Sequence, residues 1–275
     1  MNATSAHFAP AAAAAALVRA RREGRSLADF PGPLPSDLAH AYRCQDAAIE
    51  LWPERVIGWK VGYIAPERRD GSGDERLLGP VFERALWKVS DGLEVEFPVF
   101  VGGFAAVEAE YVFCLGDDAP ADRMDWTNDA AADLVATMHI AIETAGSPLA
   151  TINLLGPSVV VSDFGNNAGL ILGQPIHDWQ RRGDHELNCS TWIDDVCVGH
   201  GGASRLERGP LGALAFALGR SAQRGRALRK GDLVTTGAAT GIHDIVAGQQ
   251  ARAVFDGIGE IRCRAIARPV QESTC

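Results

Sequence analysis

Two glutamates on one predicted strand are the residues best placed to do chemistry. Apolar residues alternate along 105–115, so Glu108 and Glu110 share the opposite face of the strand. Positions two apart lie about 6.6 Å from each other along a strand, and long side chains can converge from there on one point. Two adjacent carboxylates repel and raise each other's pKa unless a cation lies between them. The pair therefore indicates a hard, oxygen-ligated ion such as Mg²⁺ or Mn²⁺.

Glu143 is the predicted third ligand. Isoleucines and small residues surround it in the segment 140–144, which indicates a carboxylate that leaves the core beside a cavity. The three glutamates could also be ordinary surface residues without a metal. Glu108 and Glu110 could face solvent, and Glu143 could be a surface residue at a helix end, where the helix dipole disfavours negative charge.

Lys60 is the predicted cation of the site. The segment 55–63 alternates as a strand does, and Lys60 shares its face with Gly58 and Gly62. A lysine between two glycines is a cationic group with space around it.

Two polar turns supply further candidate residues. Asp163 and Asn166 lie in a glycine-containing turn, and Thr236, Gly237 and Thr240 lie in a loop after a short predicted strand. Such side chains and N–H groups can bind a ligand or a metal-bound water, but they can equally cap their own turns.

The elements that must position these residues follow an α/β pattern with a strand-rich C-terminal part. Helices are predicted at 9–22, 36–52 (with Ser36 as N-cap), 128–139 and 210–225. Strands are predicted at 55–63, 93–97, 104–115, 159–161, 169–172 and 233–234, with hairpins at 187–198 and 251–265. A polar loop at 65–79 suggests a linker or lid, so we divide the chain into an N-terminal lobe (1–78) and a catalytic domain (79–275).

Composition excludes several classes of function. The 275 residues are 47% hydrophobic, the six cysteines are scattered singly, and the net charge is −9 without a basic run. We expect a soluble, cytoplasmic protein with reduced thiols that binds neither nucleic acid nor membrane. The 9–17 segment is apolar, but its arginines follow it, so it does not read as a signal peptide. Nucleotide-binding glycine motifs and the zinc-protease and serine-hydrolase motifs are absent from the sequence.

These residues resemble the 2-keto-4-pentenoate hydratase branch of the fumarylacetoacetate hydrolase superfamily, from about residue 42 to residue 263. The segments that carry the resemblance are Gly58–Gly62, Val107–Phe113, Ile142-Glu143, Ser162-Asp163 with Leu172-Gly173, Gly209–Leu211 and Lys230–Val234. The Glu-x-Glu pair with a third acid some thirty residues later is the specific part.

The resemblance implies a mixed α/β β-roll fold, a Mg²⁺ or Mn²⁺ ion on Glu108, Glu110 and Glu143, and a homo-oligomer. A small 2-oxo acid would chelate the ion, Lys60 would transfer protons or bind the carboxylate, and Asp163 would join it in catalysis. Substrate contacts would come from Asn166, Thr236, Gly237 and Thr240. Such hydratases add water to a ketonised 2-hydroxy-2,4-dienoate, which gives a 4-hydroxy-2-oxo acid in aromatic catabolism.

Departures from the hydratase pattern keep alternatives open. Phe164 and Gly165 follow Asp163 where an Asn-x-Ser-Ser turn is usual, and Thr236-Gly237-Ala238 replaces Ser-Gly-Ser. The alternatives on the same site are a C–C hydrolase of acylpyruvate or fumarylpyruvate type and a 2-oxo-enedioate decarboxylase. A further alternative is a non-catalytic member that binds a metal or a 2-oxo acid.

Overall fold

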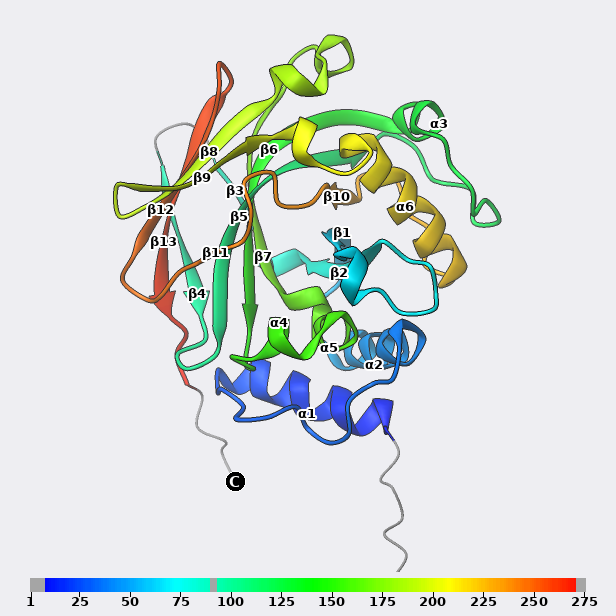
Figure 1. Cartoon of the computed structure of the whole chain (residues 1–275), viewed down its shortest axis with the longest axis vertical. Helices are drawn as coiled ribbons and strands as arrows, with labels where there is room; N and C mark the ends of the chain where they lie inside the picture. Colours follow the sequence, from blue (N-terminus) through cyan, green and yellow to red (C-terminus); the bar gives the residue numbers. More distant parts are fainter. Residues whose placement is uncertain (1–7, 90–92, 271–275) are drawn as a thin grey trace, which may run out of the picture.

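The computed structural model describes residues 8–89 and 93–270, in which two sheets curl around a common core (Figure 1). The helices are α1 (Pro10–Glu23), α2 (Leu38–Leu51), α3 (Asn128–Ala132), α4 (Ile152–Leu155), α5 (Pro157–Ser162) and α6 (Gly209–Gln223). The first strands are β1 (Val56–Tyr63), β2 (Arg76–Phe82), β3 (Leu86–Lys88), β4 (Glu94–Val99), β5 (Phe104–Leu115), β6 (Val135–Ser147) and β7 (Asn167–Pro175). The remaining strands are β8 (Asn188–Ile193), β9 (Val196–Gly202), β10 (Leu233–Thr235), β11 (His243–Asp244), β12 (Gln250–Phe255) and β13 (Gly259–Ala267).

The larger sheet carries the candidate site. Its strand order is β2-β1-β10-β5-β6-β7-β3, with β11 also paired to β5, and the second sheet has the order β4-β13-β12-β8-β9. Long antiparallel pairing of β5 with β6 forms the centre of the larger sheet. Both the mixed α/β class and the curled sheet agree with the predicted β-roll.

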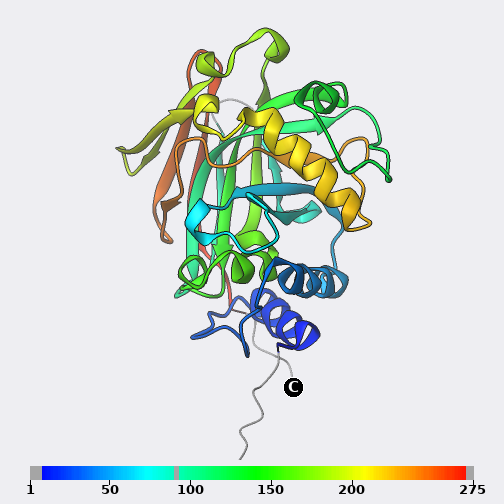
Figure 2. The same cartoon turned by 45° about the vertical axis from the view of Figure 1, so that its right-hand side comes forward.

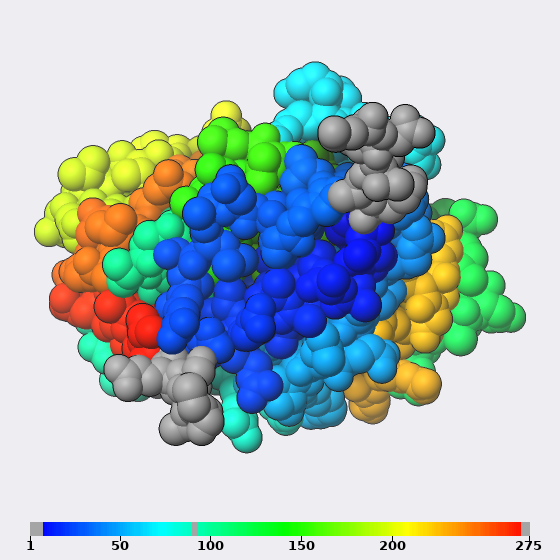
Figure 3. Space-filling view, turned by 90° about the horizontal axis from the view of Figure 1, so that it is seen from below, coloured from blue at the N-terminus to red at the C-terminus, as the bar shows by residue number. Residues whose placement is uncertain are grey.

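The N-terminal helices close one end of the roll. Helices α1 and α2 pack together beside α4 and α5 at the lower end of Figure 1, and Figure 3 shows them covering that end from below. Helix α6 lies along the other side, near β1 and β10, as Figure 2 shows. Strand β1 belongs to the same sheet as β5, and residue 78 falls within β2, so the division into lobes at that residue stays a prediction.

Most predicted elements are confirmed, including both hairpins, whose turns place Asp194, Asp195 and Gly257 at positive φ. The second helix starts as expected, but Asp37 is its cap: its side chain accepts a hydrogen bond from the His40 N–H at 2.8 Å. The loop after β1 is shorter than predicted, because β2 already begins at Arg76. Residues 1–7 of the predicted N-terminal lobe and residues 90–92 and 271–275 of the predicted catalytic domain lie outside the described residues.

Two predicted elements are wrong. The 159–161 segment is not a strand but part of α5, because Pro157 starts a helical turn that packs on α2. The predicted helix at 128–139 ends at Ala132, and β6 begins at Val135. A short apolar run fits a buried helix as well as a strand, and the long partner β5 decides the conformation of the second segment.

Candidate metal centre

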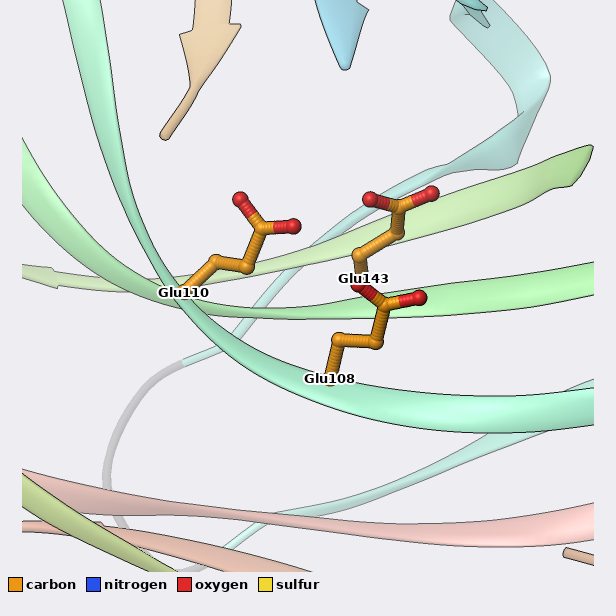
Figure 4. A group of neighbouring side chains, drawn as sticks. All are labelled: Glu108, Glu110 and Glu143. Carbon is orange, nitrogen blue, oxygen red and sulfur yellow. The ribbon is translucent and has the colours of Figure 1, made fainter. Parts of the chain in front are cut away.

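The three predicted glutamates converge at the centre of the larger sheet. Glu108 and Glu110 lie on β5, and Glu143 on β6 stands directly opposite Glu108 in the strand register. One carboxylate oxygen from each lies within 4.8 Å of the others, and Figure 4 shows the three groups pointing toward one another. All three side chains are buried, which excludes the reading that they face solvent.

One oxygen of each glutamate has no hydrogen-bond partner. These buried atoms are Glu108 Oε1, Glu110 Oε1 and Glu143 Oε2. Burial of an unpaired carboxylate oxygen costs free energy unless a cation binds it. An all-oxygen donor set of this kind fits a hard divalent ion, so the residues present suit the ion that the resemblance implies.

The remaining carboxylate oxygens are held in place by neighbouring groups. The backbone N–H groups of Thr236 and Gly237 donate to Glu110 Oε2 at 2.9 and 2.7 Å. Gly237 has φ +101°, a conformation that favours glycine, and this lets the two successive N–H groups address one oxygen. Asn167 Nδ2 donates to Glu143 Oε1 at 3.0 Å.

Burial and mutual repulsion disfavour the ionised carboxylates. Burial raises the pKa of Glu108 to about 7, with Glu143 adding to the effect and Lys60 opposing it. Burial, followed by repulsion from Glu143 and Glu108, raises the pKa of Glu110 well above its usual range. A bound divalent cation would reverse this balance by favouring the charged forms.

Lys60 lies beside the glutamates, as the sequence suggests. Its Nζ is 3.3 Å from Glu143 Oε1, and its side chain is buried. Gly62 lies beside the ammonium, but a Cβ there would meet Leu77 first, at 3.0 Å, and Lys60 Nζ only at the ordinary contact distance of 3.7 Å. Burial alone would lower the pKa of Lys60, but the charges of Glu143, Glu108 and Glu110 outweigh it and raise the pKa to about 12. The protein groups therefore keep this lysine cationic.

A cavity of about 630 Å³ opens beside this cluster. Lys60, Glu108, Asn166, Thr236 and Gly237 are buried residues of its lining. Asn166 Oδ1 is buried without a hydrogen-bond partner, while Asn166 Nδ2 donates to Asn153 Oδ1 at 3.1 Å. Four of the predicted site residues thus share one cavity wall with a predicted metal ligand.

Two predicted site residues lie elsewhere. Asp163 is ion-paired with Arg21 of α1 at 2.5 Å, accepts a hydrogen bond from Ser147, and does not line the cavity. Thr240 bonds to Thr191 at 2.7 Å and does not line the cavity either. Both side chains therefore find partners within the fold, and Arg21 and Thr191 are 142 and 49 residues away in the chain rather than in the turns themselves.

Sequence reasoning missed two residues that support the site. Asn167 contacts Glu143 directly, and Arg21 holds the backbone carbonyl of Asn167 through a 3.0 Å hydrogen bond from Nη1. The polar turn at 162–169 contained a signal for Asn167. Arg21 carried none, because an arginine in the last turn of a helix is common for other reasons.

Comparisons with known proteins agree with this geometry. No protein-family model matches the chain. It is 27% identical over 261 residues to 2-keto-4-pentenoate hydratase 1 of Dechloromonas aromatica, covering 91% of this chain and 94% of the relative. It is 28% identical to 2-keto-4-pentenoate hydratase of Burkholderia vietnamiensis, covering 92% and 95%.

Solved structures share the fold. The 4-oxalocrotonate decarboxylase from Pseudomonas putida G7, complexed with magnesium and adipate, matches with a TM-score of 0.75 at 20% identity, over 94% of this chain and 97% of that one. Fumarylpyruvate hydrolase from Pseudomonas aeruginosa, in complex with Mn²⁺ and pyruvate, matches with a TM-score of 0.56 at 19% identity, over 79% of this chain and 91% of that one. A separate finding is that, among the described residues, no helix is both long and apolar enough to cross a membrane.

The predicted resemblance to the 2-keto-4-pentenoate hydratases is confirmed along nearly the whole chain, and the fold is that of the fumarylacetoacetate hydrolase superfamily.

Proposed function

We propose that this protein is a divalent-metal-dependent enzyme that hydrates a 2-hydroxy-2,4-dienoate to a 4-hydroxy-2-oxo acid. The observation that carries the proposal is the buried trio of Glu108, Glu110 and Glu143, with three unpartnered oxygens beside a cavity. The hydratase names of relatives that match along more than nine tenths of this chain favour hydration among the reactions such a site supports.

The three glutamates would hold Mg²⁺ or Mn²⁺. When bound, the ion would supply Lewis-acid polarisation of the 2-oxo group. The N–H groups of Thr236 and Gly237 fix Glu110, and Asn167 fixes Glu143, so the ligand set is oriented before any substrate arrives.

Lys60 would bind the substrate carboxylate or deliver a proton. Its Nζ is 3.3 Å from Glu143 Oε1, in a buried position that the cavity reaches. A buried cation of this kind attracts an anionic substrate into a protein of net charge −9. The same group can donate its proton to a substrate carbon as the dienol ketonises.

A decarboxylase of a 2-oxo-enedioate is the second candidate, and a C–C hydrolase of acylpyruvate or fumarylpyruvate type is the third. The structural match to a 4-oxalocrotonate decarboxylase, with a TM-score of 0.75, motivates the second. The third is motivated by the dipeptides Thr236-Gly237 and Thr240-Gly241, which are similar to part of the Thr-Gly-Thr-Pro loop of the hydrolase branch. All three reactions would use the same metal ligands.

The test is an ultraviolet assay with three substrates: enzymatically generated 2-hydroxypenta-2,4-dienoate, its homologue with a second carboxylate, 2-hydroxyhexa-2,4-dienedioate, and an acylpyruvate. Reactions are run with Mg²⁺, with Mn²⁺ and after EDTA, and products are identified by mass. We expect metal-dependent loss of the dienol absorbance with a gain of one water. Release of CO₂ would assign the decarboxylase reaction instead, and cleavage of an acylpyruvate into two acids would assign the hydrolase. Absence of any metal-dependent turnover would contradict an enzymatic role.

A further inference from the structure

The cavity has a second cationic region away from the glutamates. Four cationic side chains line it: Lys60, Arg68, Arg76 and Arg205. Lys60 is paired with Glu143, and Arg76 is buried and paired with Glu75. Within residues 8–89 and 93–270, Arg68 and Arg205 have no carboxylate within ion-pair distance.

Arg68 is held in a fixed position without being neutralised. Its Nη2 donates to the backbone oxygen of Asn153 at 2.6 Å and to that of Leu154 at 3.3 Å. Two carbonyls fix the guanidinium, yet they leave its charge and its Nε and Nη1 donors available. This anchors the turn after β1 to α4, which lies beside it at the lower part of the roll (Figure 2).

The part of the cavity lining that comes from α4, α5 and the turn after them carries no acid. Its residues are the amides Asn153 and Asn166 and the apolar residues Pro157 and Val160, and Glu67, which precedes Arg68 in the chain, does not line the cavity. Asn153 uses its Oδ1 to accept from Asn166, which leaves its Nδ2 as a second donor beside the guanidinium. A guanidinium with a neighbouring amide donor suits a carboxylate, because charge-assisted hydrogen bonds are the strong ones.

Arg205 lies in a different electrostatic setting. Two exposed acids, Glu207 and Asp244, line the same cavity, and Glu207 is only two residues along the chain from Arg205. Arg205 is also held by a backbone carbonyl, since its Nη1 donates to the His200 oxygen at 2.7 Å, so the acids in the lining are what distinguish the two arginines. An incoming anion would therefore meet less net positive charge here than at Arg68.

We propose that Arg68 binds a second carboxylate at the far end of the substrate, so that the enzyme prefers 2-oxo dicarboxylic acids over monocarboxylic ones. This inference rests on the proposed function, because it assumes that the 2-oxo acid end is bound at the glutamates. The cavity volume of about 630 Å³ falls in the range of pockets that take ligands much larger than a three-carbon 2-oxo acid. Arg68 is exposed at the cavity rim, whereas Lys60 and Glu108 are buried, so the two binding regions lie at different depths.

The test compares two ligands of equal length, 2-oxoadipate and 2-oxohexanoate, which differ in the terminal carboxylate. Their dissociation constants are measured by calorimetry with saturating Mg²⁺ in the wild type, Arg68→Gln and Arg205→Gln. We expect the wild type to bind 2-oxoadipate at least about tenfold more tightly, the scale of a charge-assisted hydrogen bond. Arg68→Gln should remove this preference while 2-oxohexanoate binds as before, Arg68→Lys should restore part of it, and Arg205→Gln should keep it.

Three outcomes would overturn the inference. They are equal binding of the two ligands by the wild type, an unchanged preference in Arg68→Gln, and equal weakening of both ligands in that variant. Failure of the proposed function would look different, because then neither ligand would show Mg²⁺-dependent binding. Both arginines are exposed, so neither substitution removes a buried contact that folding requires.

Discussion

Two buried acidic regions of this molecule lie close in the fold but differ in how their charge is compensated. Asp163 receives two hydrogen bonds from Arg21, at 2.5 and 3.0 Å, and one from Ser147 at 2.5 Å. Within residues 8–89 and 93–270, the one ion pair of Glu108, Glu110 and Glu143 is that of Glu143 with Lys60, and each glutamate keeps one buried oxygen without a partner. The charge of Asp163 is therefore compensated by other groups of the chain, whereas the charges of the three glutamates are compensated only in part.

The difference separates an acid whose partners the fold supplies from three acids that keep donor atoms for a ligand. A buried carboxylate with all its partners supplied by the fold has nothing left with which to bind a ligand. Three buried carboxylates with unpaired oxygens lower the stability of the metal-free fold, and binding of a divalent ion recovers that free energy. The incomplete compensation of negative charge at the three glutamates is therefore the feature that indicates a functional site.

Glu110→Gln should have the largest effect on activity. Glutamine keeps an oxygen for the Thr236 and Gly237 N–H groups but removes one anionic ligand from the trio. We expect metal-dependent turnover to fall by about 10²-fold or more, on the scale of losing a principal transition-state contact. We also expect the metal-free protein to be no less stable than the wild type, because a repulsive buried charge is gone.

Steady-state assays over a Mg²⁺ titration and thermal melts in EDTA measure both effects of Glu110→Gln. A variant that retains wild-type activity at the same Mg²⁺ dependence would contradict the assignment of Glu110 as a ligand.

Asp163→Asn should have the opposite effects: a large loss of stability and little change in activity. Removing one partner of a buried ion pair leaves Arg21 uncompensated, which costs about 3–5 kcal/mol of unfolding free energy. Activity per folded molecule and the affinity for Mg²⁺ should stay within a few-fold of wild type, because Asp163 does not reach the cavity. Urea unfolding followed at two temperatures gives the stability change, and assays are run well below the melting transition.

Loss of turnover in fully folded Asp163→Asn would restore the catalytic role that the sequence suggested for this residue. Arg21→Met serves as the control: it breaks the same pair from the other side and should destabilise the fold comparably.

The sequence predicted the convergence of Glu108, Glu110 and Glu143, which the structure shows, but it did not predict the ion pair of Asp163 with Arg21, and both results have physical reasons. Alternation along a strand is local, so it places Glu108 and Glu110 on one face without knowledge of the fold. The partner of Asp163 is 142 residues away in the chain, and no local pattern reveals it. Glu143 was singled out by its apolar neighbours, although the end of the preceding helix was misplaced, because the pairing of β6 with β5 overrides local propensity.

The same limit applies to Arg68. In sequence it belongs to a polar, glycine-rich loop, where an arginine usually faces solvent. Its anchoring by the carbonyls of Asn153 and Leu154, 85 and 86 residues away, gives it a fixed position on the cavity wall. Only tertiary contacts distinguish it from the neighbouring Arg69, which contacts Tyr63 and the backbone oxygen of Ile64 instead.

Asn167→Ala is the smallest and most informative change, because Asn167 links the two regions. Its side chain donates to Glu143 Oε1 at 3.0 Å, and its backbone oxygen accepts from Arg21 Nη1 at 3.0 Å. Alanine removes the first contact and keeps the second. Groups that orient metal ligands typically contribute about 10–100-fold to metal affinity, so we expect a loss of that size with at most about 1 kcal/mol of stability.

A Mn²⁺ titration by electron paramagnetic resonance measures this affinity directly, without relying on turnover. Ser147→Ala is the matched control, because it removes the hydrogen bonds of Ser147 Oγ with Asp163 and with the Leu149 N–H and should lower stability by a similar amount. Mn²⁺ affinity should be unchanged in Ser147→Ala and weakened in Asn167→Ala. If both variants weakened Mn²⁺ binding equally, the two regions would act as one unit, and the distinction between a complete and an incomplete acidic site would not hold.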